Sequence, residues 1–192
     1  MMTALLLIDL QIDFLADSGR LPVGAVNAAG VIAVANRMAA LFAERRWPII
    51  VILNQFKKSD VIGNFFRKYA ALEGTEGGGI DPRVVVSDAR CFSKAKSSAF
   101  TNPDFAAYLK SAAIGRVVIC GVYADGCVRA TAFDALRADL DTVVLADGVA
   151  SKSNSRGKWA LSQMQKRGVS IMTFTEYLAV HAVRSQVIPP TL

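Results

Sequence analysis

The order of apolar and polar segments along the chain predicts an α/β fold. Short runs rich in Leu, Ile and Val alternate with longer segments in which apolar residues recur at steps of three and four. Short continuous apolar runs are typical of strands buried on both faces, and the intervening segments are typical of helices that cover a parallel sheet. The apolar runs predict six strands, near residues 4–9, 48–54, 84–92, 116–122, 142–147 and 168–173.

Helical periodicity occupies most of the segments between these strands. One apolar helix face is predicted between the first two strands, formed by Val31, Val34, Ala35, Met38, Leu41 and Phe42. Further helices are predicted near 102–113, 127–138, 155–167 and 175–184, with Gly168 as a stop signal and a loose Pro-Pro tail at the end. The chain is therefore expected to form a three-layer α/β/α, Rossmann-like fold around a doubly wound, mainly parallel six-stranded sheet.

The stretch from Lys57 to Pro82 is the least regular part of the chain. Charged residues come first, and a glycine cluster, Gly74-Thr75-Glu76-Gly77-Gly78-Gly79, follows. Such a cluster is compatible with a mobile lid beside a site and equally with a plain surface connection.

Length and composition narrow the class of protein. A chain of 192 residues, 53% of them hydrophobic, predicts a single domain over residues 1–192. Three cysteines do not form a disulfide framework and favour a reducing, cytoplasmic setting. The N-terminal apolar run is too short to span a bilayer and reaches Asp9 directly, so no membrane partner is expected. The net charge of +6 is spread along the chain, which argues against nucleic acid.

Three reactive side chains follow predicted strands. Asp9, Lys94 and Cys127 come after the strands near 4–9, 84–92 and 116–122. In a doubly wound sheet, ligands bind beyond the carboxyl ends of the strands, so an acid, an ammonium and a thiol can converge there. Taken alone, Asp9 is also compatible with a turn role, and Lys94, close to Lys96, with a solvated charge.

Position separates Cys127 from the other two cysteines. Cys91 and Cys120 lie in or beside apolar strand runs and are expected to be buried and inert. Cys127 lies at a loop-to-helix junction, where the helix dipole and free backbone N–H groups favour a thiolate. Cys127 is therefore the candidate nucleophile.

Other chemistries have less support in the sequence. Asp13, four residues beyond Asp9, leaves a divalent-cation site open. However, the only histidine, His181, lies in an apolar stretch, which disfavours a histidine-rich metal site and a serine–histidine pair. The glycine cluster lacks the lysine of a phosphate-binding loop. We therefore expect no metal and no other cofactor.

Three motifs resemble those of the isochorismatase-like cysteine hydrolases, the family that includes nicotinamidases and N-carbamoylsarcosine amidases. They are Asp9-Leu10-Gln11-Ile12-Asp13-Phe14, Lys94-Ala95-Lys96-Ser97-Ser98-Ala99-Phe100 and Gly121-Val122-Tyr123-Ala124-Asp125-Gly126-Cys127-Val128, and the likeness spans nearly the whole chain. The resemblance implies a catalytic triad of Asp9, Lys94 and Cys127. It also implies a cis peptide bond between Val122 and Tyr123, and an oxyanion hole formed by the N–H groups of Tyr123 and Cys127.

The departures from the family pattern narrow the expected chemistry. In the family that this chain resembles, the nicotinamidases that bind metal carry an Asp-x-His pair after the second strand. At that place this chain has Asn54-Gln55-Phe56-Lys57-Lys58. Isochorismatases proper typically lack the cysteine nucleophile. The resemblance thus implies a metal-free hydrolase that cleaves the C–N bond of a small amide or carbamoyl compound through a thioester. A vinyl-ether hydrolase and a catalytically silent binding homologue stay open as alternatives.

The substrate itself is not defined by the sequence. Phe14, Phe100 and Tyr123 are candidates for the wall of a flat apolar pocket, although aromatic residues near strand ends are more often part of the core. The family commonly forms dimers or tetramers, so the resemblance implies a homo-oligomer in which a neighbouring subunit completes the pocket.

Overall fold

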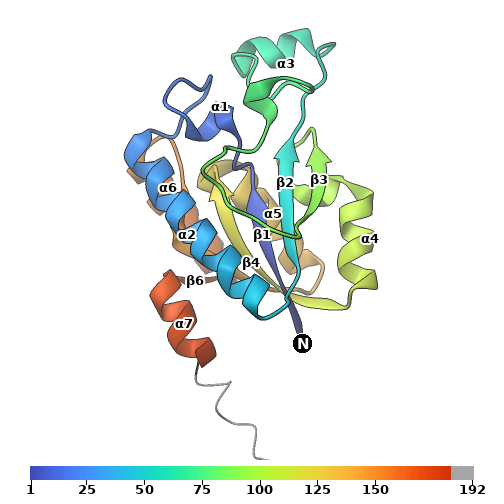
Figure 1. Ribbon diagram of the computed structural model, residues 1–192, viewed down its shortest axis with the longest axis vertical. Helices are drawn as coiled ribbons and strands as arrows, with labels where there is room; N and C mark the ends of the chain where they lie inside the picture. The colour runs from blue at the N-terminus through green and yellow to red at the C-terminus, as the bar shows by residue number, and fades with distance from the viewer. Residues whose placement is uncertain (183–192) are drawn as a thin grey trace, which may run out of the picture.

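A six-stranded, all-parallel sheet forms the centre of the protein (Figure 1). The computed structural model describes residues 1–182. The strand order is β3-β2-β1-β4-β5-β6. The strands are β1 (Met2–Ile8), β2 (Ile49–Asn54), β3 (Arg90–Lys94), β4 (Ile114–Val122), β5 (Asp141–Ala150) and β6 (Ser170–Met172). The predicted doubly wound, six-stranded fold is confirmed.

Helices cover both faces of this sheet. One layer holds α1 (Ile12–Leu15), α2 (Ala25–Glu44) and α7 (Phe174–Ala182), and the other holds α4 (Pro103–Ser111), α5 (Arg129–Arg137) and α6 (Asn154–Lys166). Side chains alternate between the faces of a strand, so Leu5 and Leu7 of β1 pack in the α2 layer and Leu6 and Ile8 in the α4 and α5 layer. This double burial explains why the strands read as continuous apolar runs. The predicted Pro-Pro tail lies outside the described residues.

The longest helix, α2, is apolar enough and long enough to cross a membrane by length and composition alone. Its apolar face is nevertheless buried in the core, where Val31, Ala35, Met38 and Phe42 pack in the same cluster as β1 and β5 side chains. The composition of α2 is therefore accounted for by its place against the sheet.

The strand predicted near 84–92 is wrong over its first half, because β3 starts only at Arg90. In the preceding segment, the N–H group of Val85 donates to Oδ1 of Asn36 at 2.9 Å, and Nδ2 of Asn36 donates to the Arg83 carbonyl at 2.9 Å. The side chain of a residue in α2 thus takes the backbone hydrogen bonds that a strand partner would take. Because β3 is the edge strand, Cys91 is exposed, which corrects its expected burial.

The glycine cluster at 74–79 is anchored to α1. The Gly78 carbonyl accepts a 2.7 Å hydrogen bond from Nε2 of Gln11, and the Gly79 carbonyl accepts one from the Ile12 N–H group at 3.0 Å. A Cβ atom on Gly77 would lie 2.4 Å from Cγ of Asp13, so only glycine allows this close packing. Of the two predicted alternatives, the structure supports a fixed connection, which contains the short helical turn η1 (Glu76–Gly78).

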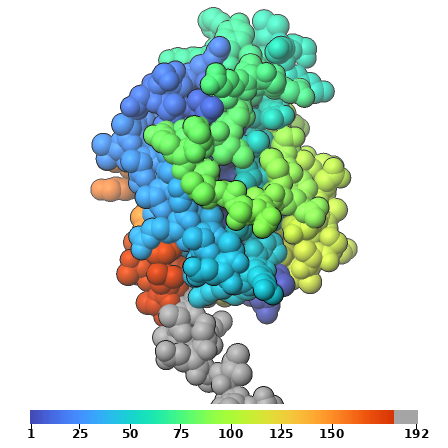
Figure 2. Space-filling model, in the orientation of Figure 1, coloured from blue at the N-terminus to red at the C-terminus, as the bar shows by residue number. Residues whose placement is uncertain are grey.

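A short helix, α3 (Val61–Phe66), projects from the body of the molecule (Figures 1 and 2). It was not predicted, because its apolar residues do not form a buried face. Ile62, Phe65 and Phe66 are all largely exposed. The α3 segment therefore carries an apolar surface that the described residues leave uncovered.

Candidate functional site

The predicted site residues meet at the switch point of the sheet. Asp9 follows β1 and Cys127 follows β4, and these neighbouring strands are where the strand order reverses. β3 ends at Lys94, at the same edge. Gly121 lies beside Ile8, and a Cβ atom on Gly121 would come within 2.1 Å of the Ile8 carbonyl oxygen. Glycine at this position therefore lets the two strands approach closely just before the site.

A buried ion pair forms the base of the site. Nζ of Lys94 lies 3.0 Å from Oδ2 of Asp9, and the two side chains are 0% and 1% exposed. Lys96, the neighbouring candidate, is exposed. Because neither partner of the pair reaches water, the charge of each is balanced by the other and by the polar groups around it.

Asn54 links this ion pair to Cys127 and was not predicted. Its Nδ2 donates to Oδ2 of Asp9 at 2.7 Å and lies 3.6 Å from Sγ of Cys127, while its Oδ1 accepts from Nζ of Lys94 at 2.8 Å. The backbone of Asn54 is held in turn by the amide of Gln11, through two hydrogen bonds of 2.8 Å. A polar residue that ends a buried apolar strand was the available signal, since the same pattern singled out Asp9.

Cys127 lies in a wide helical turn rather than at the start of a regular helix. The turn, η3 (Ala124–Val128), precedes α5, and the Tyr123 carbonyl accepts hydrogen bonds from the N–H groups of Gly126 at 2.9 Å and Val128 at 3.2 Å. The peptide bond between Val122 and Tyr123 is cis, as the resemblance implied. The helix predicted from residue 127 thus begins at Arg129.

The surroundings of Cys127 favour the thiol, in contrast to the thiolate that a helix start favours. Burial raises the pKa of Cys127 to about 12, and the negative charge of Asp9 adds to this effect while the Lys94 ammonium opposes it. The ordinary pKa of a cysteine is about 8.5. Helix-start geometry alone therefore does not decide the ionisation of this side chain, because the loss of water has the larger effect.

Asp9 is a stronger base than an ordinary aspartate. Burial raises the pKa of its carboxyl, and the Lys94 ammonium opposes this shift only in part. Oδ1 of Asp9 accepts no hydrogen bond among the described residues, whereas Oδ2 accepts two. One carboxylate oxygen beside a buried thiol is therefore available to accept a proton.

Two of the three predicted substrate-contact residues come together. The rings of Phe14 and Tyr123 meet edge to face at 5.7 Å, and the Tyr123 hydroxyl donates to the Leu21 carbonyl. Phe100 instead packs against Phe105, with ring centroids 5.1 Å apart, in the core cluster on the other face of the sheet. Tyr123 lines a pocket at the Cys127 turn, whereas Phe14 is buried in the core and lines no pocket among the described residues.

The fold and the buried cluster define the class: an α/β protein with a polar centre at the switch point of its sheet. This centre consists of a thiol, a carboxylate and an ammonium. Residues 3–176 match the family model of the isochorismatase domain, so the chain belongs to the isochorismatase family.

Individual relatives are distant in sequence. The chain is 24% identical over 186 residues to a probable inactive nicotinamidase of Arabidopsis thaliana, covering 91% of this chain and 94% of the relative. A pyrazinamidase of Pyrococcus horikoshii, solved in complex with zinc, is similar with a TM-score of 0.81 and 29% identity over 90% of this chain and 99% of that one. N-carbamoylsarcosine amidase from Thermoplasma acidophilum is similar with a TM-score of 0.78 and 23% identity, over 91% of this chain and 97% of that one.

The residues present do not fit a metal such as the zinc of that pyrazinamidase. Among residues 1–182, no group of three or more His, Cys, Asp and Glu side chains is arranged to hold a metal ion. The carboxylate of Asp13 accepts instead from the backbone N–H groups of Arg20 at 3.2 Å and Ala71 at 2.8 Å. Gln55 and Lys57 follow the second strand, and a lysine ammonium repels a cation.

Proposed function

We propose that this protein is a cysteine hydrolase that cleaves the C–N bond of a small amide or carbamoyl compound through a thioester. The observation that carries the proposal is the buried cluster in which Asn54 contacts Asp9, Lys94 and Cys127 together. The names of the structural neighbours, a pyrazinamidase and an N-carbamoylsarcosine amidase, support the same class of reaction.

Acylation begins with proton transfer from the Cys127 thiol to Asp9. The raised pKa of Asp9 favours this transfer, and the Lys94 ammonium stabilises the resulting thiolate. Sγ then bonds to the substrate carbonyl carbon, and the carbonyl π electrons move to oxygen. The N–H groups of Tyr123 and Cys127 are the proposed donors to this oxyanion, each worth about 3 kcal/mol by comparison with measured oxyanion-hole deletions.

Collapse of this intermediate breaks the C–N bond. Asp9 returns its proton to the leaving nitrogen, so ammonia or an amine departs and a thioester on Cys127 remains. Water then attacks the thioester carbon while Asp9 takes the water proton. The C–S bond breaks, the acid product leaves, and the proton returns to the thiolate. Lys94 takes no part in these proton transfers. Asn54 is the positioning residue that holds the carboxylate and the ammonium side by side.

The test is an ammonia-release screen across small amides and carbamoyl compounds, run in the presence of EDTA. Cys127→Ala is expected to abolish turnover, whereas Cys91→Ala, which removes an exposed thiol, is expected to leave it unchanged. Mass spectrometry of the wild-type protein with substrate should show an acyl adduct on Cys127. Turnover at the wild-type rate in Cys127→Ala would refute the proposal.

Two other results would support the rival functions. Cleavage of a vinyl ether without ammonia release would indicate an isochorismatase-type hydrolase. No turnover and no adduct with any compound would indicate a silent homologue, as the name of the Arabidopsis relative suggests for that protein.

A further inference from the structure

A pocket of about 280 Å³ opens beside the Cys127 turn, and the mechanism does not use it. Its walls are formed by Leu21, Tyr123, Asp125, Gly126, Lys152 and Arg156. Gly126 directly precedes Cys127, and Tyr123 carries one of the proposed oxyanion donors. A group bound in this pocket therefore lies against the turn that carries Cys127.

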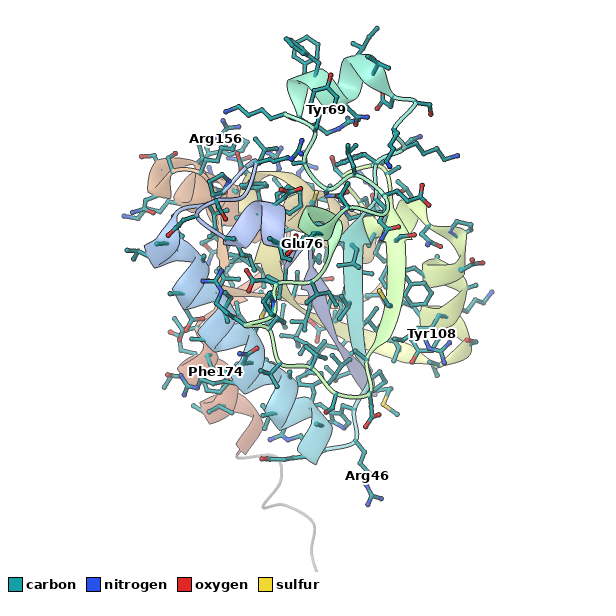
Figure 3. The ribbon with its side chains drawn as sticks, turned by 45° about the horizontal axis from the view of Figure 1, so that its top comes forward. Arg46, Tyr69, Glu76, Tyr108, Arg156 and Phe174 are labelled. Atoms are coloured by element: carbon teal, nitrogen blue, oxygen red, sulfur yellow. The ribbon has the colours of Figure 1, made fainter. Side chains whose placement is uncertain are left out.

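Sheet register places Lys152 at the rim of this pocket. Ala150, the last residue of β5, pairs with Val122 of β4, so the residues that follow each strand lie at the same edge. The Lys152 ammonium lies 6.0 Å from the centroid of the Tyr123 ring. α6 starts at Asn154, so the positive end of its dipole lies at the same edge. Figure 3 shows Arg156 toward the same end of the molecule as Tyr69, opposite Arg46.

The charges in the pocket do not cancel. Asp125 is fully engaged, because its Oδ1 accepts from the Ser151 hydroxyl at 2.6 Å and its Oδ2 from Nε of Arg156 at 2.6 Å. Asp125 therefore balances Arg156. Lys152 forms no ion pair and no hydrogen bond within the described residues, which leaves one positive charge uncompensated at the rim.

Arg156 adds further donors to this rim. Its guanidinium uses only Nε in the contact with Asp125, and its side chain is 68% exposed. The terminal N–H groups of an arginine are directed outward in a fixed plane and match the two oxygens of a carboxylate. One free ammonium and one partly used guanidinium are a good receptor for a small carboxylate.

We propose that this pocket binds a carboxylate of the substrate, with Lys152 as its main contact, while the amide or carbamoyl group of the same molecule reaches Cys127. The inference rests on the proposed function and names its substrate class: small amides or carbamoyl compounds that carry a carboxylate a few atoms from the scissile C–N bond. Tyr123 would bound the short apolar link between the two ends.

The kinetic test compares succinamate, an anionic monoamide, with the neutral succinamide and butanamide. Wild-type kcat/KM is expected to be at least tenfold higher for succinamate, and this advantage should shrink as ionic strength rises. Lys152→Met should raise KM for succinamate about tenfold with little change in kcat, because the contact forms in the ground state and the transition state alike. Neutral amides should be unaffected, which also shows that the variant is folded.

Two control variants separate local from general effects. Lys152→Arg, which keeps the charge, should retain most of the preference. Lys110→Met removes an exposed lysine at the end of α4 and changes the net charge equally, so it should leave both substrates unaffected. Equal rates on succinamate and the neutral amides, or equal losses in Lys152→Met and Lys110→Met, would overturn the inference.

Binding of succinate, measured by titration calorimetry, tests the pocket independently of turnover. Succinate should bind the wild-type protein and bind Lys152→Met at least tenfold more weakly. Absence of binding to the wild-type protein would overturn the proposed carboxylate site, even if neutral amides are hydrolysed through Cys127. Conversely, Lys152-dependent binding without any amide turnover would uphold the pocket and refute the proposed hydrolysis.

Discussion

Asn54→Ala is expected to damage both stability and turnover, because one side chain connects the whole buried cluster. It removes the hydrogen bond to Oδ2 of Asp9 at 2.7 Å, the one from Lys94 at 2.8 Å and the contact with Cys127. The ammonium and the carboxylate stay behind in a place that water hardly reaches.

The expected loss of stability follows from the two charged partners of Asn54, which are Asp9 and Lys94. A hydrogen bond to a charged group contributes about 1.5–3 kcal/mol, so the loss of two is expected to lower the free energy of unfolding by about 3–6 kcal/mol. That is a large part of the total for a domain of ordinary stability, about 5–15 kcal/mol. Loosening of Asp9 and Lys94 is also expected to lower kcat about 100-fold, the usual cost of misplacing catalytic groups by about 1 Å.

The pH profile distinguishes positioning from a merely structural role. The amide of Asn54 donates to the ionised carboxyl of Asp9, so its removal raises the pKa of Asp9 further. The carboxylate is the active form of the base. The acid limb of the kcat/KM profile of Asn54→Ala should therefore move to higher pH. Urea unfolding measures the stability change, and ammonia release across pH measures the profile.

Asn64→Ala is the matched control. Asn64 is also fully buried, and its side chain donates to the Lys57 carbonyl at 2.9 Å and accepts from Arg67 at 3.3 Å, in the α3 segment. This variant should lose stability without a shift in the acid limb. If Asn54→Ala keeps the wild-type profile and a kcat/KM within twofold, the assigned role of Asn54 is wrong.

Two further predictions concern the thiol and the quaternary structure. Asp9→Asn removes the negative charge that helps raise the pKa of Cys127, so iodoacetamide should alkylate Cys127 faster at pH 9 than in the wild-type protein, although turnover is lost. Lys94→Met should slow alkylation, because the ammonium lowers that pKa, and equal rates in all three proteins would contradict the electrostatic assignment. We also propose that the protein is a homo-oligomer that buries Phe65 and Phe66 of α3, which are 68% and 77% exposed in the single chain. Burial of a phenylalanine contributes about 1.5–3 kcal/mol, so the double change to Ser should lower the mass measured by light scattering, and an unchanged mass would place the interface elsewhere.

Much of the fold and three site positions could be predicted from residue order alone. Strands buried on both faces must be apolar throughout, so the six runs were visible in the sequence. All parallel strands end at one edge, so the residues that follow them converge whatever the details of packing. This is why Asp9, Lys94 and Cys127 could be singled out before any contact between them was known.

The remaining features depend on neighbours that are distant in sequence. Residues 84–89 look like a strand because they pack on the core, yet their backbone bonds to Asn36 of α2. Asn54 acquires its role only because β1 and β3 lie on either side of β2.

The ionisation of the Cys127 thiol shows most clearly the difference between what the sequence indicates and what the tertiary structure decides. The sequence placed Cys127 at a helix start, where a local dipole favours a thiolate. Only the tertiary structure encloses Cys127 and places the Asp9 carboxylate beside it, and together these raise its pKa to about 12. The positions of the strands along the chain follow from local apolarity. Ionisation depends instead on the water and the charges around a group, and those are known only once the chain has folded.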